Sequence, residues 1–226
     1  MNAKPPASTF ISEIVHTHTT DGKSICIRSI RPGDEERMRA GIAQLSTQSR
    51  YLRFFSVQPM PSDKVIERLV DADGHDHLAW GAIHNDGADN PAVGAVHAIR
   101  SETQQGLGEY SVAVLDDYQG IGLGRVLTTV LLIHCHVEGI CKLDIQTLSE
   151  NHGAISFIRS IGGELQRWEG GVQDYTLDVK SALDAIQAAP EMQSIRDVFC
   201  ILGKYLPPKA LVVPATIPEK PPAPLA

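Results

Sequence analysis

Residues 110–131 read YSVAVLDDYQGIGLGRVLTTVL, and this stretch decides the fold. Its first six residues alternate larger and smaller side chains, which is typical of a β-strand. From Gly122 to about Val137, apolar residues recur at spacings of three and four, which predicts a helix. These residues are Leu123, Val126, Leu127, Val130 and Leu131. The segment is therefore expected to form a strand, a glycine-rich turn and a helix.

The turn Gln119–Gly124 is suited to binding an anion. The first N–H groups of a helix have no partner within the helix, and they carry the positive end of the helix dipole. A phosphate group is stabilised by both effects, and glycine lets it approach the backbone closely. Arg125, just inside the helix, offers one cationic contact. The alternative is that Gly120, Gly122 and Gly124 only permit tight packing at a helix start.

Two other phosphate-binding motifs do not fit this turn. The dinucleotide-binding fingerprint requires Gly-x-Gly-x-x-Gly, and the third glycine here stands at a different spacing. The P-loop requires Lys and then Ser or Thr after its last glycine, whereas Gly124 is followed by Arg125 and Val126. The turn therefore predicts neither a Rossmann unit nor a P-loop.

The rest of the chain alternates strand and helix patterns. Strands are expected at residues 13–17, 24–28, 77–83, 93–99, 110–115, 142–147, 164–168 and 172–179. Helices are expected at residues 34–44, 62–70, 122–137, 151–161 and 195–202. Asp21-Gly22 suits a hairpin turn between the first two strands. The order predicts a mixed α/β fold, with strand, helix, strand and helix in the second half.

Composition suggests one main domain with additions at both ends. We expect a flexible arm over residues 1–11, the domain over 12–183, a helical extension over 184–206 and a Pro-rich disordered tail over 207–226. The formal net charge of −7 argues against binding duplex nucleic acid. No apolar run reaches the ~20 residues of a membrane span, and the N-terminus lacks the apolar core of a secretory signal.

The cysteines and histidines predict reduced thiols and no metal. Four cysteines are spread through apolar stretches without a disulfide framework, which favours a cytoplasmic location. His134-Cys135-His136 invites a metal site, but residues at i and i+2 point to different faces of a helix. With Cys141 nearby, the spacing matches no established zinc pattern.

Two motifs together resemble the GNAT superfamily of N-acyltransferases. Gln119-x-x-Gly122-x-Gly124 is similar to the loop with which this family binds the pyrophosphate of acyl-CoA. Asn151-x-x-Ala154-x-x-Phe157, followed by Arg159-x-x-Gly162, resembles the later motif of the family. The resemblance implies a three-layer mixed α/β fold. Its central sheet would be mostly antiparallel, have about six to seven strands flanked by helices, and be splayed at the acyl-CoA site.

Finer features resemble the acetyltransferase domain of bacterial Pat-type protein-lysine acetyltransferases. These are Leu52-Arg53-Phe54-Phe55 after Ser46-x-x-Ser49, and Glu109 followed by Asp116-Asp117-x-Gln119-Gly120. The arginines of residues 50–55 either line the acceptor entrance or lie on the outside of a helix packed on the sheet. The sequence leaves these two alternatives open.

The resemblance also implies the residues that bind acetyl-CoA, the cosubstrate. In this family the pantetheine arm pairs with the backbone of the strand before the loop, and Asn151 contacts the arm or caps its helix. The implied set is Val112, Ala113, Val114, Gln119, Gly120, Ile121, Gly122, Leu123, Gly124, Arg125, Asn151 and Phe157. Many relatives place a tyrosine directly after Phe157 to protonate the departing thiolate, and Ile158 stands there instead.

Glu109 is implied as the general base by its place in the resemblance. Making a lysine amine neutral at pH 7 costs roughly 4–5 kcal/mol, and a positioned carboxylate can take the proton. Burial near the sheet is expected to raise the pKa of such a base. The alternative is an exposed carboxylate at the end of a strand. Asp116 and Asp117 are better suited to a solvated turn.

The function expected is therefore an acetyl-CoA-dependent N-acetyltransferase that modifies a primary amine, with a protein lysine as the favoured acceptor. A polyamine, amino acid or aminoglycoside is the alternative acceptor within the same fold. A non-catalytic acyl-CoA-binding regulatory module is the alternative from another class. Neither nucleic acid nor a membrane is expected as a partner.

Overall fold

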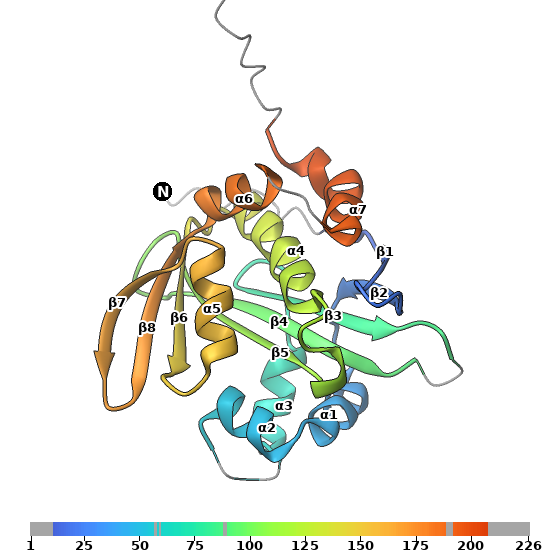
Figure 1. The fold of residues 1–226 in the computed structure, drawn as a ribbon, viewed down its shortest axis with the longest axis horizontal. Coiled ribbons are helices and arrows are strands. Elements are labelled where there is room, and N and C mark those ends of the chain that lie inside the picture. Colours follow the sequence, from blue (N-terminus) through green and yellow to red (C-terminus); the bar gives the residue numbers. More distant parts are fainter. Residues whose placement is uncertain (1–10, 57, 59, 88–89, 189–191, 208–226) are drawn as a thin grey trace, which may run out of the picture.

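A computed structural model describes residues 11–207, except 57, 59, 88–89 and 189–191 (Figure 1). The predicted arm up to residue 10 and the Pro-rich tail from residue 208 lie outside the described residues. Ile11, at the edge of the predicted arm, is buried, and its carbonyl accepts a hydrogen bond from Ser29 Oγ. Ile11 is therefore part of the packed domain and not of a flexible arm.

One eight-stranded sheet forms the centre of the molecule, in the order β1-β2-β3-β4-β5-β6-β8-β7. The strands are β1 (Val15–His18), β2 (Ser24–Ser29), β3 (His77–His84), β4 (Ala92–Arg100), β5 (Leu107–Val114), β6 (Lys142–Leu148), β7 (Glu164–Glu169) and β8 (Val172–Asp178). All neighbours are antiparallel except β5 and β6, which are parallel. The mixed α/β, mostly antiparallel sheet is confirmed. The expected count of six to seven strands is wrong, because the first and last hairpins both join the same sheet.

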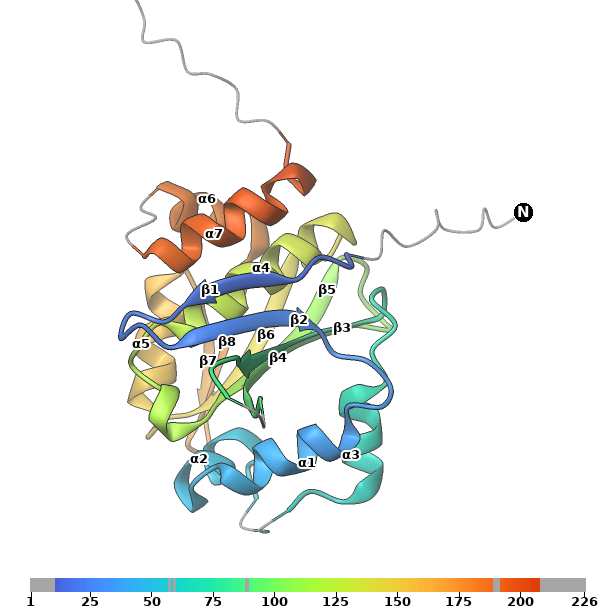
Figure 2. The same cartoon turned by 90° about the vertical axis from the view of Figure 1, so that its right-hand side faces the viewer.

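Helices cover both faces of the sheet (Figure 2). On one face lie α1 (Glu35–Gln44), α2 (Thr47–Phe54) and α3 (Asp63–Val70); on the other lie α4 (Leu123–Val137) and α5 (His152–Ser160). Two further helices, α6 (Val179–Ala188) and α7 (Gln193–Leu202), pack against α4. Two short 3₁₀ turns complete the described elements, η1 (Asp116–Tyr118) and η2 (Gly203–Tyr205). The three-layer arrangement is therefore present.

The core lies between the sheet and α4, and it extends into the C-terminal helices. Leu127, Leu131 and Trp80 of this core are fully buried. Ile195, Val198 and Leu202 of α7 belong to the same apolar cluster. The expected domain boundary at residue 183 falls inside α6, because β8 runs directly into that helix. None of the described helices is long and apolar enough to cross a membrane.

His134 of α4 is held neutral inside this core. Its Nδ1 accepts a hydrogen bond of 3.1 Å from Trp80 Nε1. Burial lowers the pKa of His134 to about 4. His77 and His97 are also buried, and burial lowers the pKa of each. Because these side chains take up protons near pH 6.5 only after unfolding, acid favours the unfolded state.

We predict that His134 makes the protein lose stability in mild acid. For a pKa of about 4 in the folded state and about 6.5 in the unfolded state, lowering the pH from 7.5 to 5 removes about 2 kcal/mol of unfolding free energy. Urea unfolding at the two pH values measures this loss. In His134→Gln the loss is smaller by that amount, while His16→Gln, an exposed control on β1, retains it. An equal loss in wild type and His134→Gln would contradict the assignment.

Candidate functional site

The sheet opens where β5 and β6 stop pairing. Their register joins Leu107–Tyr110 to Lys142–Ile145 and ends there, although β5 continues to Val114 and β6 to Leu148. The Leu115 N–H donates to the Val93 carbonyl in the β4 direction. The direction in which the backbone N–H and C=O groups point alternates between successive residues of a strand. The N–H and C=O groups of Val112 and Val114 therefore point away from β4, into the gap. The structure therefore leaves a strand edge without a neighbouring strand at the position implied for the pantetheine arm, and only the Val114 carbonyl there accepts a side-chain hydrogen bond, from Gln119.

The turn Gln119–Gly124 lies at the end of that edge and leads into α4. Gly120 has φ +72° and Gly122 has φ +85°, both in the left-handed region that favours glycine. Gly122 is the N-cap residue of α4. A Cβ at Gly122 would overlap the side chain of Met192, which packs directly against this glycine. Gly120 is therefore required by its backbone conformation, and Gly122 both by its conformation and by close packing.

Several elements hold the turn in place. Gln119 Nε2 donates to the Val114 carbonyl at 3.0 Å and to Ser49 Oγ at 3.2 Å. The Thr20 N–H in the β1–β2 hairpin donates to the Ile121 carbonyl at 3.2 Å. Lys23 Nζ donates to the Asp117 carbonyl at 3.1 Å. The turn is thus braced from β5, from α2 and from the N-terminal hairpin.

Asp116 connects α2 to this turn. Its carboxylate accepts hydrogen bonds from the Ser46 N–H, from Ser46 Oγ and from Ser49 Oγ at 2.7–3.0 Å. Burial raises the pKa of Asp116, but these hydrogen bonds outweigh it, so the pKa is lowered. Ser46 also caps α2, since its side chain accepts from the Ser49 N–H. The Ser-x-x-Ser spacing therefore serves both helix capping and the attachment of the loop.

The residues of the second motif lie at the start of α5 and along it. Asn151 is the N-cap, with its side chain accepting from the Ala154 N–H at 3.1 Å. Phe157 packs half-buried against the core. Ile158 is buried in the core, and a Cβ at Gly163 would overlap it. Arg125 Nη2 donates to Ser160 Oγ at 3.0 Å, which ties α4 to α5. Asn151 thus caps its helix, which is one of the two roles implied for it.

Glu109 lies on β5 just before the strands diverge. Its side chain is exposed, so the prediction that this carboxylate is buried is wrong. The reason is that Glu109 lies on β5 before the part of the strand that α2 covers. Its register partner on β6 is Asp144, whose carboxylate accepts from Thr176 Oγ1 at 3.0 Å. Two carboxylates therefore stand side by side at this surface. Sequence patterns did not reveal Asp144, because only the strand register brings it beside Glu109.

Arg53 reaches from α2 to the same strand. Its Nη2 donates to Ser111 Oγ at 2.8 Å, so this arginine contacts the sheet and does not lie on the outside of the helix. Across β4, His97 is the register partner of Ser111. His97 Nδ1 lies 3.0 Å from His77 Nε2, and His77 Nδ1 lies 3.1 Å from the Asp71 carbonyl. Since that carbonyl only accepts, His77 carries its proton on Nδ1 and accepts from His97.

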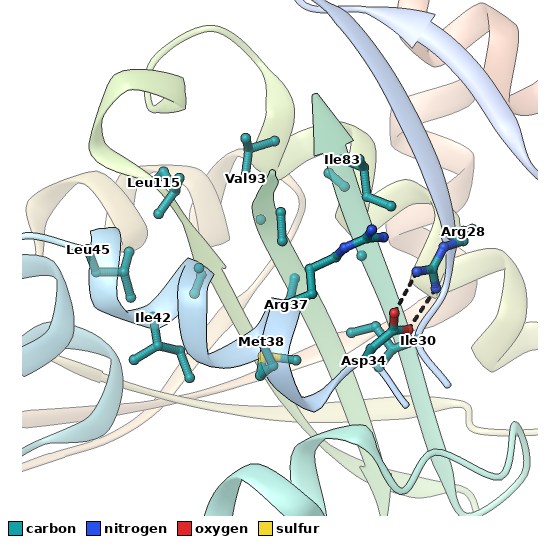
Figure 3. A pocket seen from close by; sticks show the side chains of 17 residues that line it. Arg28, Ile30, Asp34, Arg37, Met38, Ile42, Leu45, Ile83, Val93 and Leu115 are labelled. Atoms are coloured by element: carbon teal, nitrogen blue, oxygen red, sulfur yellow. Dashed lines mark hydrogen bonds and ion pairs between the residues drawn. The ribbon is translucent and has the colours of Figure 1, made fainter. Parts of the chain in front are cut away.

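A separate cavity lies between α1 and the sheet (Figure 3). Apolar side chains line most of it, and at its rim Arg28 donates two hydrogen bonds of 2.8 and 2.7 Å to Asp34. Neither Glu109 nor the turn Gln119–Gly124 lines this cavity. Within the described residues, no group of three His, Cys, Asp or Glu side chains is arranged to hold a metal ion.

Comparison with known protein families identifies the family to which this opened sheet and its turn belong. The sequence model of the acetyltransferase (GNAT) family matches residues 45–162, more than half of the chain. The chain belongs to the GNAT acetyltransferase family. The match includes α2, the opened β5 edge, the turn and the Asn151 motif. The family consists of acetyltransferases, and it uses acetyl-CoA as acyl donor.

Individual relatives agree with this assignment. The chain is 29% identical over 177 residues to acetyltransferase Pat of Mycolicibacterium smegmatis. The aligned region covers 78% of the chain and 52% of the relative. It is 32% identical over 89 residues to mycothiol acetyltransferase of Kocuria rhizophila, covering 39% of the chain and 24% of the relative. The chain thus spans about half the length of the Pat relative it matches.

Solved structures share the fold. The GNAT domain of S. lividans PAT superposes with a TM-score of 0.66 at 24% identity, covering 73% of this chain and 96% of that one. Spermidine N-acetyltransferase from Vibrio cholerae, solved with CoA and spermine, superposes with a TM-score of 0.54 at 14% identity, covering 70% and 98%. These likenesses support the arrangement of the sheet and its helices.

We predict that Gly120→Ala weakens acetyl-CoA binding about tenfold. A side chain at a positive φ costs on the order of 1 kcal/mol, and relief of that strain would turn the N–H groups of the loop away from the phosphates. Isothermal titration with acetyl-CoA measures the change. Gly139→Ala is the matched control, because Gly139 has φ +73° and open space around it at the opposite end of α4. Equal affinities for the two variants would contradict a phosphate site at the turn.

Proposed function

We propose that this GNAT domain transfers the acetyl group of acetyl-CoA to a primary amine, with a protein lysine as the favoured acceptor. The observation that carries the proposal is the unpaired β5 edge, which connects the turn Gln119–Gly124 to Glu109. The pyrophosphate would bind the N–H groups at the start of α4. The pantetheine arm would pair with the backbone of Val112 and Val114 as an additional strand. The thioester would then lie near Ser111, two residues from Glu109.

Glu109 is proposed as the general base. Its carboxylate is exposed on the sheet face that α2 covers farther along β5, and an acceptor can approach it from solvent. It would take a proton from the ammonium group, and the neutral nitrogen would attack the thioester carbonyl carbon. Asp144 beside it adds a second negative charge that attracts a cationic acceptor. The nitrogen would lose its second proton to water as the C–S bond breaks, and Glu109 would return its proton to solvent. CoA would leave as a thiolate and take a proton from water, since a thiol of pKa ~8.5 is a tolerable leaving group.

A lysine acceptor is supported by similarity to Pat-type acetyltransferases and by the two carboxylates at an exposed surface. An exposed base is accessible to the side chain of a folded protein as well as to a small amine. We also propose a cytoplasmic location, because acetyl-CoA is the donor and Cys26, Cys135, Cys141 and Cys200 form no disulfides.

We predict that Glu109→Gln lowers acetyl transfer about a hundredfold or more, because a neutral amide cannot take the amine proton. Release of CoA is measured with an amine panel of Nα-acetyl-lysine amide, spermidine and a lysine-rich protein. Acetyl-CoA affinity stays unchanged in this variant, since Glu109 lies outside the phosphate loop. Glu102→Gln, an exposed residue in the loop before β5, serves as the charge control.

Two outcomes would contradict the proposal. Unchanged turnover of Glu109→Gln on every amine would reject this residue as the base. Binding of acetyl-CoA without acetylation of any amine in the panel would favour the regulatory-module alternative. A preference for spermidine over both lysine acceptors would retain the enzyme and replace its acceptor.

A further inference from the structure

The cavity beneath α1 lies over a row of small residues on the sheet (Figure 3). Arg28, Gly81, Ala95 and Ala113 are register partners on β2, β3, β4 and β5, so they form one line across four strands. Side chains of directly paired residues lie on the same face of a sheet, and all four residues line the cavity. Three of them carry only a hydrogen atom or a methyl group. The row is therefore a trough that ends at the guanidinium of Arg28.

Helix α1 covers this trough without filling it. Where α1 passes over β4 it carries Gly41, which places no side chain in the space beside Ala92. The cavity volume is about 70 Å³, roughly half of the ~150 Å³ of an apolar cavity that takes up benzene. A chain of about four or five carbon atoms therefore fits between the helix and the sheet.

The interior of the cavity favours an aliphatic ligand. Its walls are branched or flexible apolar side chains from α1 and the strands, namely Ile30, Met38, Ile42, Ile83 and Leu115. The lining atoms of an empty apolar space lack partners for dispersion contacts, and water gains no hydrogen bonds there. Methylene groups in this space would restore those contacts and leave water themselves.

The mouth of the cavity carries a net positive charge. Asp34 accepts two hydrogen bonds from Arg28 and one of 3.0 Å from the Arg31 N–H, so its carboxylate is already paired. Arg37 is exposed and lines the same cavity, and within the described part of the chain its guanidinium forms no hydrogen bond or ion pair. In Figure 3 it reaches from α1 toward Arg28. Hydrogen bonds from Arg28 lower the pKa of Asp34, and the charge of Arg37 acts in the same direction. Two guanidinium groups and one carboxylate thus leave one positive charge at the mouth.

We propose that this cavity is a binding site for a short aliphatic carboxylate, with its chain beneath α1 and its carboxylate at Arg37. A guanidinium group binds a carboxylate through two parallel N–H···O bonds. A neutral aliphatic molecule would leave this charge unused, and a cationic one would be repelled by it. The site is independent of the function proposed above, because neither Glu109 nor the turn Gln119–Gly124 lines the cavity.

Titration of ¹⁵N-labelled protein tests the site with sodium acetate, butyrate and hexanoate at constant ionic strength and neutral pH. We expect saturable shifts of the amide signals of Gly41, Gly81 and Ala95, and none at Gly120 of the glycine turn. Affinity rises about fourfold for each added methylene group until the cavity is filled. Butylamine, with the same chain and the opposite charge, binds about tenfold more weakly than butyrate or worse, because like charges repel at the mouth.

Two variants separate the contributions of the charge and of the cavity. Arg37→Gln weakens butyrate binding about fivefold, as expected for an exposed charge pair. Arg39→Gln is the matched control, since it removes a positive charge from the same helix outside the cavity, where Arg39 pairs with Asp63, and it leaves the affinity unchanged. Ala95→Leu fills the trough and abolishes the saturable shifts, while thermal unfolding confirms that this variant is folded.

Three results overturn the proposal. One is the absence of saturable shifts around the cavity with all three carboxylates. Another is shifts centred on the turn Gln119–Gly124, which mark an anion held at the start of α4. The third is equal butyrate affinity of Arg37→Gln and Arg39→Gln, or of butyrate and butylamine, which marks an apolar space without a carboxylate contact. If Ala95→Leu does not fold, the chain-length series and Arg37→Gln decide, because both leave the core unchanged.

Discussion

The end of pairing between β5 and β6 is the constraint on which the rest of this structure depends. Four register pairs hold the two parallel strands together, and beyond Tyr110 and Ile145 each strand follows a different antiparallel neighbour. Backbone groups of Val112 and Val114 are thereby left at an internal strand edge. An unpaired edge inside a sheet is costly unless a ligand or water satisfies it. A pantetheine arm, with its amide groups, is a ligand of the right shape and chemistry.

The turn at Gln119–Gly124 is useful only because it is held at the end of that edge. Gln119 bonds to the strand itself, and Asp116 bonds to the first turn of α2. Since α2 also carries Arg53, the same helix contacts both the phosphate-binding turn and the face where Glu109 lies. The N-terminal hairpin and Met192 support the turn from the other side. One small set of polar contacts thus connects the donor site to the acceptor face.

Local patterns in the sequence predicted most strands and helices, because apolar periodicity reflects burial directly. They also predicted the glycine turn and the Asn151 cap, whose chemistry is contained within a few consecutive residues. They did not reveal α6, which continues from β8 without a break. Asp144 and the contact between Arg53 and Ser111 depend on strand register and helix docking, which no local pattern contains. The prediction that Glu109 is buried is wrong for the same reason, since the exposure of a strand residue depends on which element covers the strand.

Amide hydrogen exchange along β5 tests the central claim most directly. Saturating CoA is added to ¹⁵N-labelled protein, and exchange is followed for Val112, Ala113 and Val114. If the pantetheine arm completes the open edge, exchange slows strongly at Val112 and Val114, whose N–H groups point into the gap. Ala113, whose N–H points toward β4, changes little. Bound CoA that leaves Val112 and Val114 unprotected, or that protects Ala113 equally, would contradict the account.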